Sequence, residues 1–121
     1  MGRPLQASRE AAGRIGRRQM NKKITMTEIL DDLRVADEIT RRFERHYWLS
    51  SEDFYALYQK GMLDDGEHLE DFTKWAGFYE IKLDRETLLQ KLSKERLQKL
   101  QAQASGGIVD IVPNEPVMTI A

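Results

Sequence analysis

Carboxylates crowd one short stretch of the chain, and their possible chemistry is the easiest to name. The stretch covers residues 64–71 and contains Asp64, Asp65, Glu67, Glu70 and Asp71, with His68 among them. Such oxygen ligands suit calcium or magnesium, but a calcium-binding loop alternates its ligands and ends on a bidentate carboxylate, which this stretch does not do. His68 has no second histidine four residues away, as a zinc-binding helix would place it. We therefore predict an acidic helix start favoured by the helix dipole, with no metal and no cofactor.

Arg41 and His46 form a second pair that could act on a substrate. Their spacing, Arg-x4-His, resembles the loose motif of the helical HEPN ribonucleases. That resemblance implies that Arg41 binds phosphate and that His46 assists proton transfer during RNA cleavage. The position after the arginine, commonly polar in that motif, is Arg42 here. Read from the residues alone, the same pair is the basic end of a helix, stabilised by the helix dipole.

Several kinds of catalytic site are missing from the sequence. The chain has no cysteine, which removes thiolate nucleophiles and cysteine-based metal sites and fits a reducing cytoplasm. Gly106 and Gly107 follow a predicted helix and precede no Lys-Ser/Thr pair, so they are not a phosphate-binding loop. Ser50 and Ser51 are typical helix caps rather than nucleophiles. The sequence therefore predicts no catalytic residue and a protein that is not an enzyme.

Helix boundaries are clear in the first half of the chain. Thr25 and Glu28 form a capping box before an apolar stripe that repeats at spacings of three and four, which predicts a helix over residues 26–48. Ser50 predicts a second helix start, and Gly61 predicts its end because glycine adopts a left-handed conformation without penalty. Trp48 and Trp75 could stack nucleic-acid bases, but their spacing along the stripes favours a place in the core.

The second half of the chain predicts two more helices. A third helix follows the acidic stretch, and Asp84 is a candidate cap for a fourth that reaches about residue 103. Together these elements predict an all-α domain over residues 25–103, a compact bundle of about four helices. At 121 residues the chain suits one domain, which is small enough for a homodimer to stabilise it. No apolar run approaches the length that crosses a bilayer, so no membrane contact is expected.

The two ends of the chain differ from the domain between them. Residues 1–23 contain seven arginines or lysines and one acidic residue, Glu10, which gives a charge of +6, whereas the whole chain carries −1. Residues 1–24 are therefore predicted to be a basic, flexible arm, and its residues Arg14, Arg17 and Arg18 could touch nucleic acid. The arm could equally be an extension upstream of a folded unit. The rest of the chain is acidic.

A flexible tail is predicted at residues 104–121. Ser105-Gly106-Gly107 ends the last helix, and a short β-prone apolar stretch follows at residues 108–112. Such a segment could fold on a partner by adding a strand to the edge of its sheet.

Three stretches of the chain carry a second resemblance, at residues 47–55, 61–65 and 70–79. They resemble small helical prokaryotic proteins that are encoded beside small toxin-like genes and are regarded as antitoxins of toxin–antitoxin pairs. The chain departs from that pattern at Trp48, where glycine is usual, and at Lys74, where glutamate is usual. The resemblance implies a cytoplasmic protein that binds a small partner toxin without catalysis. The residues expected to contact the toxin are Asp64, Asp65 and Glu67 in the acidic turn and Ile108, Val109, Ile111 and Val112 in the tail.

Overall fold

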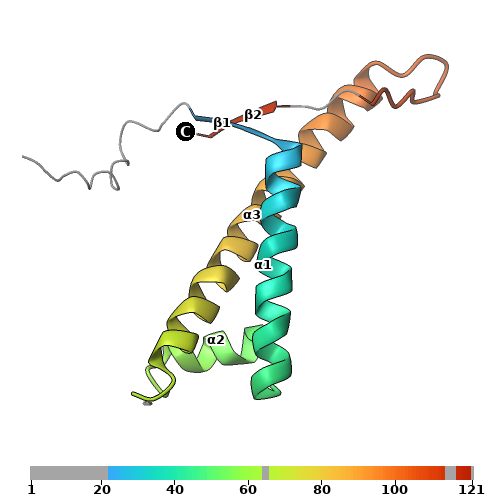
Figure 1. Cartoon of the computed structure of the whole chain (residues 1–121). Helices are drawn as coiled ribbons and strands as arrows, with labels where there is room; N and C mark the ends of the chain where they lie inside the picture. The colour runs from blue at the N-terminus through green and yellow to red at the C-terminus, as the bar shows by residue number, and fades with distance from the viewer. Residues whose placement is uncertain (1–21, 64–65, 114–116, 121) are drawn as a thin grey trace, which may run out of the picture.

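The structure is a computed structural model that describes residues 22–63, 66–113 and 117–120. Its elements are, in chain order, β1 (Lys22–Thr25), α1 (Met26–Tyr47), α2 (Ser51–Gln59), α3 (Leu69–Ala102) and β2 (Val117–Ile120). The long helices α1 and α3 lie side by side in opposite directions and form a helical hairpin (Figure 1). Helix α2 crosses between them at one end, and the two short strands lie near the other end (Figure 1). The predicted all-α class is confirmed, because the helices α1, α2 and α3 contain most of the described residues.

Both predicted helix starts in the first half are confirmed at the level of hydrogen bonds. The Thr25 hydroxyl accepts from the Glu28 backbone N–H at 3.1 Å, and the Glu28 carboxylate accepts from the Thr25 N–H at 2.9 Å. Ser50 caps α2 by accepting from the Asp53 N–H at 3.1 Å. After α2, Gly61 has a φ of 68°, the left-handed conformation that its sequence position predicted.

The predicted boundary at Asp84 is wrong, because α3 is one continuous helix of 34 residues. The Asp84 carboxylate accepts from the Arg85 side chain instead of capping a backbone N–H. Arg85 also donates from Nε to Asp32 of α1 at 2.8 Å, so this part of α3 is fixed against the first helix. With no proline or glycine between residues 78 and 102, nothing interrupts the helix. The described residues therefore form three helices rather than the predicted four.

The strand pair was not predicted from the sequence. Strand β1 pairs antiparallel with β2, with Lys22 opposite Ile120 and Thr25 opposite Val117. This pairing joins the segment directly before α1 to a segment close to the end of the chain. Among the described residues, no helix is long and apolar enough to cross a membrane.

The interior of the hairpin is divided into two clusters. At the α2 end, Phe43, Phe54, Trp75 and Ala76 are buried together. At the strand end, Ile24, Ile29 and Leu92 are buried together. Hydrogen-bonded ion pairs link the helices between them, at 3.2 Å from Lys82 to Asp37 and at 2.8 Å from Arg85 to Asp32.

Candidate functional site

Directly after α3, the chain reverses in a tight turn. Ser105 and Ile108 exchange two backbone hydrogen bonds, at 3.2 and 3.1 Å. Gly106 and Gly107 between them have φ values of 63° and 81°. Two successive left-handed residues are the signature of a two-residue hairpin turn, which strongly favours glycine at both places. The turn therefore directs residues 108–113 back along the end of α3.

The predicted tail contacts lie beyond this turn and face solvent. Ile108 is 72% exposed and Ile111 70%, while Val109 and Val112 are also exposed. The Arg96 side chain of α3 donates to the Val112 carbonyl. Further along, β2 pairs with β1. The apolar segment of residues 108–112 is thus held at both ends, and its four aliphatic side chains remain uncovered.

The carboxylates of the acidic stretch, residues 64–71, do not lie together on one surface where the structure describes them. Asp64 and Asp65 lie outside the described residues. Glu67 and Glu70 line a surface hollow of about 720 Å³ with Leu69 and Lys74. Asp71, by contrast, faces α1 and accepts a hydrogen bond from the Tyr47 hydroxyl at 2.7 Å.

His68 packs among rings, with centroids 5.7 Å from Tyr47 and 5.8 Å from Phe72. Within the described part of the chain, no three His, Cys, Asp or Glu side chains come together in a way that could hold a metal ion. Where the structure describes it, the acidic stretch is a set of helix-start side chains that point in different directions.

Arg41 and His46 lie on different sides of α1. Five residues of an α-helix turn about 140° beyond a full circle, so side chains at this spacing diverge. Arg41 is engaged with its own helix, donating from Nη1 to Glu44 at 2.9 Å and lying 3.4 Å from Asp37. The hydrogen bond to Glu44 and the nearby carboxylates raise the pKa of Arg41. The arginine of the predicted phosphate-binding pair is therefore already neutralised by carboxylates.

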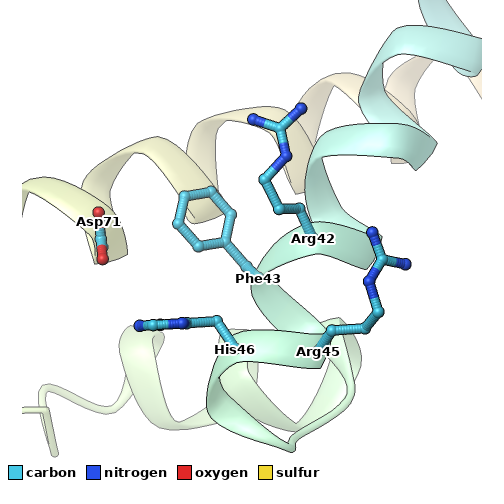
Figure 2. A pocket seen from close by; sticks show the side chains of 5 residues that line it. All are labelled: Arg42, Phe43, Arg45, His46 and Asp71. Atoms are coloured by element: carbon cyan, nitrogen blue, oxygen red, sulfur yellow. The ribbon is translucent and has the colours of Figure 1, made fainter.

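His46 instead lines a hollow of about 380 Å³ at the end of α1. Figure 2 shows the other side chains around it, with Asp71 contributed by α3 and the rest by α1: Arg42, Phe43, Arg45 and Asp71. The His46 ring also meets the Tyr47 ring edge-on, with centroids 4.6 Å apart. Two exposed arginines and an imidazole thus share one surface.

A hydrogen-bond chain, buried at Trp75 and partly buried at Glu44, connects the three helices beside this surface. Trp75 donates from its indole N–H to the Ser51 hydroxyl at 2.8 Å, and the Ser51 backbone N–H donates to Glu44 at 2.9 Å. Burial alone would raise the pKa of Glu44, but the hydrogen bonds from Ser51 and Arg41 outweigh it and lower that pKa below its ordinary value of 4.5. Ser51 therefore anchors the indole of Trp75. Sequence reasoning missed the link, because its partners lie on different helices and follow no shared spacing.

Trp48 is not in the core, which corrects its predicted place. Its side chain is 85% exposed, whereas that of Trp75 is 1% exposed. The Trp48 backbone ends α1 in the left-handed region, with a φ of 56°, and its N–H donates to the Glu44 carbonyl at 2.8 Å. The antitoxin pattern has glycine here, the residue that adopts this conformation most easily.

Comparison with protein-family models, curated proteins and solved structures finds no match for the chain. The resemblances to antitoxins and to HEPN ribonucleases therefore stay predictions. Arg14, Arg17 and Arg18 of the basic arm lie outside the described residues.

Proposed function

We propose that the protein is a non-enzymatic protein-binding module, an antitoxin-type partner that neutralises a small toxin. The observation that carries this proposal is the exposed apolar segment at residues 108–112, held between the end of α3 and strand β2. Contiguous exposed aliphatic side chains are typical of surfaces that another protein covers. The antitoxin class comes from the sequence resemblance, and the segment supplies a physical means of binding.

The geometry of the tail suits the addition of a strand to a partner's sheet. Among the described residues, the backbone of residues 109–111 has no ladder partner, so its N–H and C=O groups are available to a sheet edge. Backbone hydrogen bonds then supply affinity and alternate side chains supply specificity. Because both ends of the segment are already held, less conformational entropy is lost on binding than from a free tail.

The charge of the body supports the same kind of partner. The chain outside the basic arm is acidic, and Glu67 and Glu70 lie on an exposed surface at the start of α3. A toxin that acts on RNA needs a basic surface, which an acidic protein complements. Asp64, Asp65 and Glu67 remain the predicted polar contacts in this proposal.

The proposal is tested by co-expressing the tagged chain with the product of its neighbouring gene and measuring the complex. Replacing Ile108 and Ile111 together by aspartate should weaken the complex at least about a hundredfold, because it buries two charges where aliphatic side chains would sit. The matched control is Leu83→Asp on α3, an aliphatic residue that is 41% exposed and lies about 20 Å along the helix from Arg96, which should leave the complex intact. Equal binding by the tail variant and the control would refute the proposal.

The ribonuclease alternative is separated by one further variant. His46→Ala should weaken the protein complex far less than the tail variant does, since His46 lies on α1 and the apolar contacts of the tail follow α3. If the purified chain cleaves RNA and His46→Ala abolishes that cleavage, the ribonuclease hypothesis replaces the proposal of a non-enzymatic binding module. A contribution of Arg14, Arg17 and Arg18 to nucleic-acid binding would appear as steep salt dependence that disappears when those three arginines are replaced by glutamine.

A further inference from the structure

The α2 end of the hairpin carries two exposed surfaces of opposite charge. We define the basic half as the surface around the end of α1, formed by Arg42, Arg45, His46 and Trp48. We define the acidic half as the surface around the start of α3, formed by Met62, Glu67, Leu69 and Glu70. Both halves lie at the same end of the molecule, because α1 ends and α3 begins there (Figure 1).

The basic half contains two arginines that form no ion pair with any described residue. Arg42 and Arg45 are exposed and form no ion pair with any residue that the structure describes. Arg41 and Arg85 behave differently, since each is paired with carboxylates. Beside these free guanidinium groups, Trp48 projects its side chain into solvent from a left-handed backbone. Exposed tryptophan and arginine are the residue types that contribute most to protein interfaces.

The acidic half has the complementary composition. Glu70 is exposed and forms no ion pair among the described residues. It lines the hollow at the start of α3 together with Leu69, which is 61% exposed, and with Lys74. Met62, at the end of α2, is 63% exposed. Each half therefore has exposed apolar side chains beside charge, negative here and positive in the other half.

We propose that two copies of the chain associate through these halves, in a twofold arrangement. In such a dimer the basic half of one copy contacts the acidic half of its partner, and the same contact occurs twice. Within one copy, Asp71 is the carboxylate that faces α1, whereas Glu70 lines the separate hollow. A second copy supplies partners to Arg42, Arg45 and Glu70, and it covers exposed apolar side chains of both halves. Glu67 is also one of the proposed toxin contacts, whereas Arg45, Trp48 and Glu70, the residues that the experiment changes, are not.

Charge reversal tests the arrangement with the full chain alone. The mass of the chain in solution is measured by sedimentation over the micromolar range, where weak dimers form and dissociate. Arg45→Glu and Glu70→Arg should each weaken the dimer at least about tenfold, because each places like charges opposite one another twice. An equimolar mixture of the two variants should restore it, since both contacts then join opposite charges. The double variant Arg45→Glu/Glu70→Arg should dimerise as well as the native chain.

Trp48→Gly separates binding from folding. Glycine suits the left-handed backbone at this position, so the variant should keep or raise the unfolding midpoint while the dimer weakens at least about tenfold. The matched control for the two charge reversals is Lys91→Glu. Lys91 is exposed and lies about 30 Å further along α3 than Glu70, so its reversal should leave the dimer unchanged. A chain that stays monomeric at every concentration overturns the proposal. So does a dimer that survives Arg45→Glu, Glu70→Arg and Trp48→Gly.

Discussion

The buried clusters at the two ends of the helical hairpin differ in composition. At the α2 end, the Trp75 ring stacks on Phe54 with centroids 3.8 Å apart and planes 1° from parallel, and Phe43 and Tyr47 stack on it at 5.5 and 5.7 Å. At the strand end, the buried residues are the aliphatic Ile24, Ile29 and Leu92. The first end combines large rings with a buried hydrogen bond from Trp75 to Ser51, whereas the second relies on a few aliphatic side chains, one of which belongs to strand β1 itself.

The different compositions of the two clusters indicate which end of the hairpin contributes more to its stability. Aromatic residues bury the largest areas of any side chains and gain further from ring contacts. An isolated pair of short strands is at best marginally stable in water and depends on the side chains beneath it. Between the clusters, α1 contributes the small buried residues Ala36 and Thr40. We therefore expect the α2 end to persist under conditions in which the strand end opens, as happens when local stabilities differ along a protein.

Trp75→Ala should have the largest effect, because it removes the centre of the aromatic cluster. The substitution should lower the free energy of unfolding by about 3–5 kcal/mol, which is enough to unfold many domains of this size. Chemical denaturation followed by circular dichroism measures it. The same substitution at Trp48, which is 85% exposed, is the matched control and should change stability by less than about 1 kcal/mol. Similar losses from both variants would mean that the aromatic cluster does not dominate.

Leu92→Ala should destabilise the other end by a smaller amount. Leu92 is 3% exposed and packs with Ile24 and Ile29, so a loss of about 2–3 kcal/mol is expected. Hydrogen exchange should show faster exchange in β1 and in the first turns of α1, while the amides around Trp75 keep their protection. Leu97→Ala is the control, since Leu97 is half-exposed. Equal acceleration at both ends would show that the hairpin unfolds as one unit.

The features that the sequence predicted are those decided by neighbouring residues. Thr25 with Glu28, Ser50 with Asp53, and Gly61 each act within a few positions, and each proved to be where its pattern indicated. The prediction at Asp84 was wrong because a capping residue alone does not end the helix that precedes it. Something else must also stop that helix from continuing.

The features that the sequence did not predict depend on distant partners. Strand β1 forms only because β2 returns from close to the end of the chain. Ser51 anchors Trp75 across two helices, and no spacing in the sequence indicates that pair. Trp48 fitted the apolar stripe by type, but the left-handed end of α1 leaves its side chain in solvent. The candidate contacts in the tail could be named from their residue types, whereas the turn and the bond from Arg96 that hold them could not.

Glu44→Gln tests the polar part of the α2 end. Burial opposes the charge on Glu44, but Ser51 and Arg41 stabilise it and lower the pKa of the carboxylate below 4.5. A group whose pKa is lower in the folded state stabilises the fold above its unfolded pKa, and that contribution disappears as the pH falls through the folded value. The variant should therefore be less stable by about 1 kcal/mol at neutral pH. Denaturation curves at a series of pH values should show this difference shrinking below pH 4.5. A difference that is constant with pH would exclude the ionised carboxylate as its cause.

Gly77→Ala should have the smallest effect, and it tests whether the two ends are coupled. Gly77 follows the buried Trp75 and Ala76 on α3, and a Cβ built there meets no atom within 4 Å. Alanine in a helix interior is favoured over glycine, so the variant should be more stable by about 0.5–1 kcal/mol. Because α3 runs through both clusters, hydrogen exchange after this substitution reports on their connection. Slower exchange at the α2 end alone would support two separately stable regions, whereas slower exchange in β1 as well would mean that α3 transmits stability along the whole hairpin.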